Sequence, residues 1–539
     1  MPVTFRTVAV LLLSTCAAFA ALSLERRDAP ASEIPFQKTS AVNITDDSYL
    51  DYFYLVNITL GGREFTVELD TGSSDFWLYA PELQVANDSG LTANITYLDR
   101  RSASGPIQFA ELQIGEYTVP SQAFINTRSL AGWPVDRSGL LGVSFSTDNL
   151  SRIERTIHRA WGKSSTLGRS VMANIFAQNA SMEASYDLTL GRKVDDEESS
   201  SAGGTFIIGY HDPRYSNITQ APQIPKVVAD EWAGYLDGMT VNGENIPLPA
   251  SHIAHTPPGK LVALFDSGTS NVLVPPSLAD AVYSQIAGSI KVGDSWLIPC
   301  YSAANVTFVI GGMTYPVHPL DISRVYPTWG LLSDGTNATY VVCEGSISTL
   351  QADDVDVILG DVFLKNTYTS FNFGSANRDQ TPSGANGSFV QLLSTTDADD
   401  AWIDFHLTRG ATLSEKYPIS IDPAFLPALF PRVYSSQNAT GTGALTPIAV
   451  RVSRALEATC TDRATTLLST YGPVAIGLLA ANLAIMLLLC IIALVACTRR
   501  RTQERTVSAT YNPVAFSNKQ GSEHDLHDDM PAVIYNDQY

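Results

Sequence analysis

Two short segments of the chain carry an aspartate in the same setting. Residues 67–74 read VELDTGSS and residues 262–270 read VALFDSGTS. In each segment an apolar run ends at an aspartate, Asp70 or Asp266, which is followed by a small hydroxyl residue, a glycine and a second hydroxyl residue. Apolar residues then resume in both. The repetition predicts that two similar halves of the chain each deliver one carboxylate to a shared site.

A third Asp-Ser-Gly, at residues 88–90, serves as an internal comparison. Its flanks are polar, no apolar strand leads into it, and no apolar run follows it. This context is typical of an ordinary turn. We therefore assign chemistry only to the other two copies.

Two carboxylates held close together cannot both ionise easily, so they share one proton. The ionised member can take a proton from water while the protonated member donates a hydrogen bond to a carbonyl group. Gly72 and Gly268 allow close approach of the backbone. The sequence therefore predicts acid–base chemistry on a carbonyl compound, with Asp70 and Asp266 as the reacting pair.

The hydroxyl residues around the two aspartates are expected to support them. Thr71 and Ser267 can tie the two loops together, because each stands directly after its aspartate. Ser73 and Thr269 can hydrogen-bond the outer carboxylate oxygens and fix their orientation.

Short strands are expected to position these loops. Apolar residues alternate over 54–60 and 65–69 around the glycines at 61–62, which predicts a hairpin leading to Asp70. Asn57 falls on the face opposite its apolar neighbours. The same rhythm continues to about residue 395, with a closing strand over 388–393 and short helices only near 149–161 and 277–286. The 37 glycines and 29 prolines also favour β-structure with frequent turns.

Residues 396–472 differ in composition from the part before them. Ile403, Phe405 and Leu407 alternate with polar residues, which predicts one more strand. Four prolines between residues 418 and 431 exclude a regular helix there. We expect a stem over residues 396–472.

Both ends of the chain carry apolar segments with distinct roles. A short apolar run after Arg6, with small residues near position 20, predicts a signal peptide over 1–20 and a short prosegment or extension over 21–46. Residues 474–497 are long and apolar enough for one transmembrane helix. Arginines 499–501 place the polar tail, residues 498–539, in the cytoplasm as a disordered segment.

This layout predicts a single-pass type I membrane protein of the secretory pathway, at the cell surface or in the vacuole. The glycosylation sequons agree, since all of them precede the apolar span. They are Asn43, Asn57, Asn87, Asn94, Asn149, Asn179, Asn217, Asn305, Asn337, Asn386 and Asn438.

The net charge and the cysteine content of the chain indicate which ligands and partner molecules it can bind. A net charge of −20 argues against nucleic acid. No Cys/His set has zinc spacing, and we expect neither a metal nor a cofactor. Cys300 and Cys343, both in the second half, are expected to pair in an oxidising compartment. Cys460 would then stay free or link two chains as a dimer.

The chain resembles the pepsin-like aspartic proteases over roughly residues 49–395. Both aspartate loops match the active-site loops of that family, and Trp77 matches the tryptophan after the first loop. Residues 139–142 (GLLG) and 358–364 (ILGDVFL) match the apolar segments that cross behind the loops. Cys300 and Cys343 match the disulfide of the second lobe. The resemblance to membrane-anchored fungal members extends to the apolar span.

The resemblance implies a mainly β, bilobal fold with a cleft between two β-rich lobes, here about 47–225 and 226–395 within a 47–395 domain. It implies an aspartic endopeptidase that hydrolyses polypeptides at acidic pH by a water activated between Asp70 and Asp266. The flap over the cleft would carry Tyr97 and Asp99.

Several positions depart from the family pattern. Leu98 and Arg100 stand where flap glycines are common, and Ser138 stands where an aspartate is usual. The first-lobe disulfide is missing. Asp99 matches a flap aspartate that favours a basic residue before the cut in some fungal relatives, although a solvated hairpin tip explains it equally well. The altered flap and Ser138 leave one alternative open, a catalytically silent peptide-binding or adhesion ectodomain.

Overall fold

The computed structural model describes residues 41–46, 53–83, 87–98, 100–128, 138–192, 203–331, 337–350, 352–374, 387–417, 420 and 423. The predicted signal peptide, transmembrane span and tail lie outside these ranges, as do Asp99 and Cys460. Within the described ranges, no helix combines the length and apolar character needed to cross a membrane.

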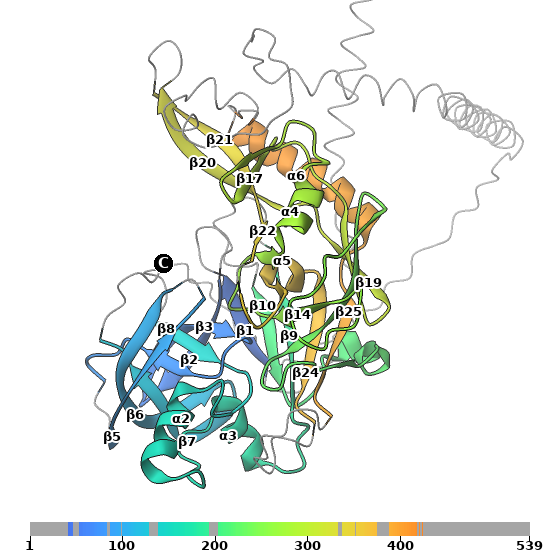
Figure 1. The fold of residues 1–539 in the computed structure, drawn as a ribbon. Coiled ribbons are helices and arrows are strands. Elements are labelled where there is room, and N and C mark those ends of the chain that lie inside the picture. The colour runs from blue at the N-terminus through green and yellow to red at the C-terminus, as the bar shows by residue number, and fades with distance from the viewer. Residues whose placement is uncertain are drawn as a thin grey trace, which may run out of the picture. The chain divides into compact units, whose positions relative to one another are not determined.

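The first half of the described chain consists mainly of strands (Figure 1). Its elements are β1 (Ala41–Asp46), β2 (Tyr54–Leu60), β3 (Arg63–Asp70), β4 (Phe76–Leu78), β5 (Asn87–Thr96), β6 (Ser102–Ile114), β7 (Tyr117–Asn126), β8 (Gly139–Gly142), α2 (Arg152–Trp161), α3 (Val171–Gln178), β9 (Ser185–Leu190) and β10 (Gly204–Ile208).

The second half begins with a short 3₁₀ helix, η1 (Pro213–Gln220). Its other elements are β11 (Ile224–Pro225), β12 (Ala233–Val241), β13 (Glu244–Ile246), β14 (Leu261–Phe265), β15 (Val272–Val274), α4 (Pro276–Tyr283), β16 (Ile290–Val292), β17 (Ser295–Ile298), β18 (Val306–Ile310), β19 (Met313–Val317), β20 (Ser323–Leu331), β21 (Asn337–Gly345), β22 (Ile347–Thr349), β23 (Val357–Leu359), α5 (Asp361–Leu364), β24 (Thr367–Asn372), β25 (Phe389–Ser394) and α6 (Ala398–Glu415).

The two halves repeat one arrangement of strands. In the first, the β2–β3 hairpin leads to Asp70, and β8 runs parallel to β3 and antiparallel to β4. In the second, β12 and β14 lead to Asp266, and β23 runs parallel to β14 and antiparallel to β15. Each aspartate therefore lies where a buried strand ends beside a crossing strand. The repetition predicted from the two sequence segments is present in the backbone.

A shared sheet joins the halves. Two strands near the end of the second half continue the sheet of the first half: β24 pairs with β9, and β25 pairs with β24. Aromatic side chains fill the space beside it: the ring of Trp232 lies 4.3 Å from that of Phe145 and 4.7 Å from that of Phe373, centroid to centroid. Trp232 and Phe373 are fully buried. The aromatic cluster thus packs residues from both halves together.

Several sequence predictions are confirmed by these elements. The hairpin over β2 and β3 forms as expected, and Asn57 is exposed between buried neighbours. The closing strand is β25, and the two expected helices are α2 and α4. The short helices α3 and α5 were not predicted. The third Asp-Ser-Gly is not an ordinary turn: it forms an irregularity inside β5, where Gly90 has a φ of 71° and donates its N–H to Asp88.

The strand predicted from Ile403, Phe405 and Leu407 is wrong, because this segment forms the helix α6. Asp397 caps its start by accepting hydrogen bonds from two backbone N–H groups of the first turn. Phe405 is fully buried, whereas Ile403 and Leu407 are 59% and 64% exposed. Alternation over five residues cannot be distinguished from a helical stripe with two apolar residues facing solvent.

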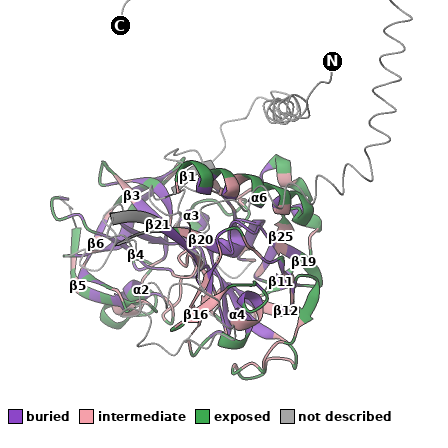
Figure 2. Cartoon of the chain, turned by 90° about the horizontal axis from the view of Figure 1, so that it is seen from above, coloured by how far each residue is buried: buried purple, intermediate pink, exposed green. Residues whose placement is uncertain are grey.

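The buried face of α6 attaches the helix to the second lobe. Its residues Ala401, Phe405, Arg409, Thr412 and Leu413 are buried. The guanidinium of Arg409 donates to the hydroxyl of Ser323 at 3.2 Å and to its carbonyl oxygen at 3.0 Å. Figure 2 shows the helix along the surface of the folded body, with its outer residues largely exposed. Residues 398–415 therefore belong to the folded part of the chain.

We expect Phe405→Ala to lower the free energy of unfolding by about 3–5 kcal/mol, because it removes a fully buried ring. Leu407→Ala, on the exposed face of the same helix, should change it by less than about 0.5 kcal/mol. Thermal or denaturant unfolding of the purified chain measures both. Equal effects of the two substitutions would contradict the packing of α6.

Candidate active site

Each aspartate is held by its own loop in the same way. Asp70 Oδ1 accepts a hydrogen bond from the Gly72 N–H at 2.8 Å, and Asp70 Oδ2 accepts one from the hydroxyl of Ser73. The second loop repeats this pattern at Asp266, with the Gly268 N–H at 2.9 Å and the Thr269 hydroxyl at 2.6 Å. The loop contacts therefore fix the orientation of both carboxylates.

The two loops are joined by four buried hydrogen bonds between Thr71 and Ser267 and the strands beside them. The Thr71 N–H donates to Ser267 Oγ at 3.1 Å, and the Ser267 N–H donates to Thr71 Oγ1 at 3.0 Å. The Thr71 hydroxyl donates to the carbonyl oxygen of Phe265 at 3.0 Å, and the Ser267 hydroxyl donates to that of Leu69 at 2.8 Å. Each hydroxyl thus bonds backbone on the opposite side.

The glycines allow the carboxylates to come together. A Cβ atom on Gly72 would lie 2.5 Å from Asp266 Oδ1, and one on Gly268 would lie 2.5 Å from Asp70 Oδ1. Each carboxylate therefore packs against the glycine of the opposite loop. The two aspartates remain slightly open to solvent, at 4% exposure for Asp70 and 7% for Asp266.

The surroundings make the pair hard to ionise fully. Burial raises the pKa of Asp70 well above its ordinary value, and both the charge of Asp266 and a hydrogen bond between the two side chains raise it further. The bonds from Ser73 and Gly72 oppose this rise. A proton retained on Asp70 can therefore be shared with Asp266 through the hydrogen bond between the two side chains.

The proposed flap is the hairpin formed by β5 and β6. Tyr97 stands at its tip, and its hydroxyl accepts a hydrogen bond of 2.8 Å from the indole N–H of the fully buried Trp77. Arg100 has a φ of 67°, a region that glycine occupies without strain. Leu98 is 61% exposed. The hairpin thus keeps its turn although arginine and leucine occupy the positions where glycine was expected.

Asp75, which the sequence reasoning missed, links the first loop to α2. Its buried carboxylate accepts hydrogen bonds from the hydroxyl of Ser151 at 2.7 Å and from the N–H groups of Arg152 at 2.7 Å and Ile153 at 3.0 Å. Burial raises its pKa, and these three bonds oppose the rise. An acidic residue directly before the apolar run at 76–78 was the available signal.

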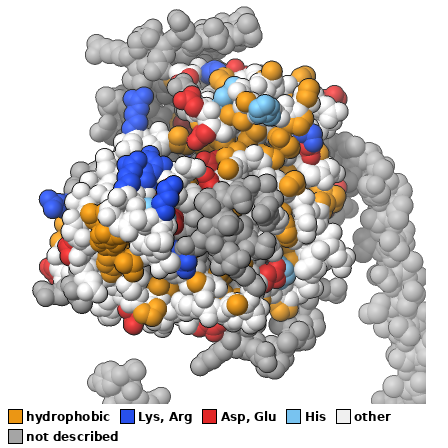
Figure 3. Space-filling view, turned by 60° about the horizontal axis from the view of Figure 1, so that its bottom comes forward, with side chains coloured by type: hydrophobic (Ala, Val, Ile, Leu, Met, Phe, Trp, Pro, Cys, Tyr) orange, Lys and Arg blue, Asp and Glu red, His pale blue; other side chains and the backbone are white. Residues whose placement is uncertain are grey.

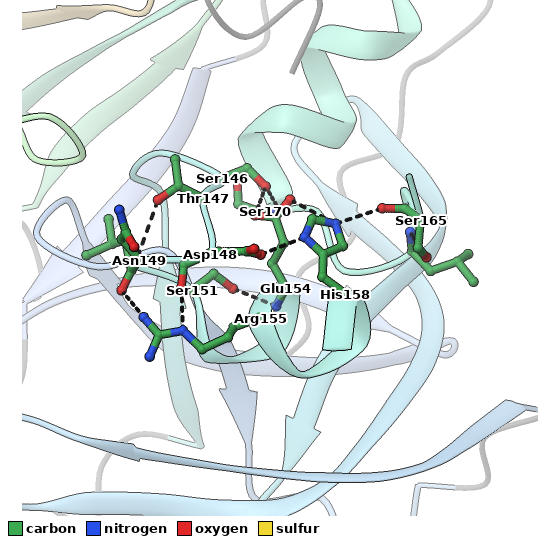
Figure 4. Close-up of polar contacts among 12 residues, drawn as sticks. Ser146, Thr147, Asp148, Asn149, Ser151, Glu154, Arg155, His158, Ser165 and Ser170 are labelled. Atoms are coloured by element: carbon green, nitrogen blue, oxygen red, sulfur yellow. Dashed lines mark hydrogen bonds and ion pairs between the residues drawn. The ribbon is translucent and has the colours of Figure 1, made fainter. Parts of the chain in front are cut away.

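A polar cluster beyond Asp75 fixes the segment that leads into α2 (Figure 4). The ring of His158 contacts Asp148 at 2.6 Å and the carbonyl oxygen of Ser165 at 3.0 Å. The guanidinium of Arg155 donates to the carbonyl oxygen of Asn149 at 2.8 Å. These contacts hold residues 146–151 in place beside the first loop.

Other predicted residues lie away from the aspartates. Cys300 and Cys343 form a disulfide in the second lobe. The backbone of Ser138 forms two hydrogen bonds with neighbouring segments. Its N–H donates to the carbonyl oxygen of Thr66 at 2.9 Å, and its carbonyl oxygen accepts from the N–H of Tyr79 at 2.8 Å. The described sequon asparagines are all exposed; they are Asn57, Asn87, Asn94, Asn149, Asn179, Asn217 and Asn305. The side chains of Asn43, Asn337, Asn386 and Asn438 lie outside the description.

We expect Gly72→Ala and Gly268→Ala each to destabilise the protein by about 1–3 kcal/mol, because the added Cβ would overlap the opposite carboxylate. Gly410→Ala is the matched control, since a Cβ there meets nothing within 4 Å inside α6. It should stabilise the helix by about 0.5–1 kcal/mol. Thermal unfolding measures these effects: the unfolding temperature should fall for Gly72→Ala and Gly268→Ala and rise for Gly410→Ala. A lower unfolding temperature for Gly410→Ala would contradict the described packing.

Comparison with known proteins identifies relatives of similar sequence. Rhizopuspepsin-4 of Rhizopus niveus is 25% identical over 359 residues, which cover 62% of this chain and 78% of the relative. Penicillopepsin-3 of Penicillium janthinellum is also 25% identical, over 353 residues covering 61% and 78%. The solved aspartic proteinase from Irpex lacteus matches with a TM-score of 0.48 and 19% identity, covering 66% of this chain and 97% of that one.

A family model provides the assignment. The model of the eukaryotic aspartyl protease matches residues 51–379, which contain both aspartate loops, the flap hairpin and the disulfide. This match covers more than half of the sequence. The chain therefore belongs to the eukaryotic aspartyl protease family, and it is a pepsin-like aspartic endopeptidase.

Proposed function

We propose that Asp70 and Asp266 are the catalytic pair of this endopeptidase, that it works in acid, and that it is anchored to a membrane with the catalytic domain outside the cytosol. The observation that carries the catalytic assignment is the packing of each carboxylate against the glycine of the opposite loop, under identical loop hydrogen bonds. This geometry holds two acids within reach of one substrate group.

The reaction follows from the shared proton. The ionised carboxyl of the pair takes a proton from a water molecule, whose oxygen forms a bond to the carbonyl carbon of the peptide. The protonated carboxyl donates to the carbonyl oxygen as negative charge develops there. A proton then passes to the leaving nitrogen and the C–N bond breaks. The products are a carboxylic acid and an amine, and the pair again holds one proton.

The remaining residues position the pair and the substrate. Ser73 and Thr269 orient the outer carboxylate oxygens, and the bonds of Thr71 and Ser267 fix the distance between the loops. Tyr97, held by Trp77, would close over an extended polypeptide bound along the cleft. Such a peptide binds through backbone hydrogen bonds, with side-chain pockets for specificity.

Support for the anchoring comes from the sequence and from surface exposure. Residues 474–497 are long and apolar enough to span a bilayer, and arginines follow at 499–501. All seven sequon asparagines with described side chains are exposed, as glycosylation in the secretory pathway requires. The cell surface and the vacuole both satisfy this topology.

Asp70→Asn and Asp266→Asn should each lower the cleavage rate of a peptide library by at least about a hundredfold, because each removes one acid–base group. Asp88→Asn is the matched control, since it alters the third Asp-Ser-Gly, at the opposite end of β5 from the flap tip at Tyr97. It should cleave at the wild-type rate. Cleavage should be sensitive to pepstatin and should fall as pH rises through the raised pKa of Asp70, because the shared proton is then lost. Well-folded wild-type protein without cleavage would favour a silent peptide-binding ectodomain.

Chain expressed in a secretory cell should stay with membranes after an alkaline wash, whereas chain ending at residue 473 should be released. Removal of N-linked glycans should reduce the apparent mass of both forms. Release of the full chain by the wash would contradict the anchor, and an unchanged mass would contradict the lumenal placement.

A further inference from the structure

The register of β12 and β14, continued beyond the two strands, places Glu231 across from Asp266. β12 and β14 pair antiparallel with Ala233 opposite Leu264, and the Phe265 N–H donates to the carbonyl oxygen of Trp232 at 3.0 Å. The next residues along the two segments are Glu231 and Asp266. Residues across from each other on antiparallel segments direct their side chains to the same face. The charge of Asp266 acts on Glu231, as this proximity requires.

The other half of the molecule has an apolar residue in the equivalent place. β2 and β3 pair with Leu55 opposite Glu68, so that Phe53 falls across from Asp70. The guanidinium of Arg101, from the flap hairpin, lies 6.0 Å from the ring centre of Phe53. The two equivalent positions therefore differ in chemistry: the extended register places an aromatic residue across from one aspartate and a carboxylic acid across from the other.

No side chain in the described ranges compensates the buried carboxyl of Glu231. Its Oε2 atom is buried and has no hydrogen-bond partner within the described part of the chain. Burial raises its pKa to about 7, and the negative charges of Asp354, Asp266 and Asp230 contribute to the rise. An acid placed among like charges without a partner destabilises a fold. A structural role does not account for it.

The nearby positive and polar groups are already occupied. Lys226 donates to the carbonyl oxygen of Ala229, and its ammonium lies 3.8 Å from the ring centre of Phe145. Asp230 accepts a hydrogen bond of 2.9 Å from the side chain of Asn149, across the two halves. Acidic side chains occur across the face seen in Figure 3, whereas Lys and Arg gather mainly on its left side, over the first lobe. Among the residues that the structure describes, no cation is paired with Glu231, so a ligand could supply one.

We propose that Glu231 determines specificity, by selecting polypeptide substrates that place a Lys or Arg side chain beside the scissile bond on the Asp266 side. The substrate cation would form a charge-assisted hydrogen bond with Oε2. This inference rests on the proposed proteolytic function of Asp70 and Asp266 and adds a substrate class to it.

The preference for a basic substrate is expected to change with pH in one direction. Because its pKa is about 7, Glu231 is protonated in acid before substrate binds. A bound cation favours the ionised form, so binding releases a proton and strengthens as pH rises toward 7. Asp230, Asp266 and Asp354 oppose ionisation throughout this range, and Lys226 is the described cation close to Asp230. The preference for a basic substrate should therefore be smaller at pH 4 than at pH 6.

The test compares matched peptides on the full-length chain in mild detergent. The peptides differ only in Lys against norleucine, an uncharged side chain of similar length, at each position flanking the cut. We expect wild-type protein to cleave the best Lys peptide with a kcat/KM at least about tenfold higher than its norleucine partner at pH 6. In Glu231→Gln the ratio should fall to about one. Glu244→Gln, an exposed site on β13 in the same lobe, should keep the wild-type ratio.

Three outcomes would overturn the inference. Equal cleavage of both peptides by wild-type protein would contradict it while leaving the proteolytic function intact. If the preference for the Lys peptide disappears in Asp99→Asn but persists in Glu231→Gln, the flap determines that preference and Glu231 does not. If the ratio of kcat/KM for the Lys and norleucine peptides stays constant from pH 4 to pH 6 in wild-type protein, the inference is also wrong. Failure to cleave even the norleucine peptides would instead refute the proposed function on which the inference depends.

Discussion

The reciprocal hydrogen bonds of Thr71 and Ser267 are the constraint on which the site depends. They join two loops that lie far apart in the sequence, and all four bonds are buried. Both aspartates stand directly before these residues, so any change in the distance between the loops would change the distance between the carboxyls. The raised pKa of Asp70 follows from that distance together with burial. The same hydrogen bonds thus set the spacing of the two carboxyls and contribute to the raised pKa of Asp70.

The near-symmetry of the two halves makes their differences informative. The loops, the crossing strands and the glycine contacts repeat, whereas the residues one strand away do not. Phe53 and Glu231 occupy equivalent positions beside the two aspartates. A symmetric pair of acids has no direction of its own, but a peptide does. Because the residues next to the two aspartates differ, the protein can favour one of the two directions in which a peptide could bind.

The sequence was most predictive where residue type and spacing act locally. Asp70 and Asp266 could be predicted because each follows an apolar strand and precedes the same small residues. The helix α6 could not, because three alternating apolar residues fit both a strand and a helix, and only burial of Phe405 against the second lobe decides between them. Glu231 could not be predicted either, since its importance comes from strand register, which no local pattern specifies. Asp75 acts through bonds to α2, more than seventy residues away.

The attachment of α6 has a mechanical consequence. After the last strand, β25, the chain does not leave the folded body but runs along the second lobe, where Arg409 bonds Ser323 and lies 3.5 Å from the disulfide sulfur of Cys343. Tension on the segment beyond residue 417 would load this helix first. The β20–β21 hairpin, which contains Ser323 and the disulfide-bonded Cys343, would carry that load before the strands that end at the two aspartates. The two aspartate loops would thereby be insulated from a pull on the chain beyond residue 417.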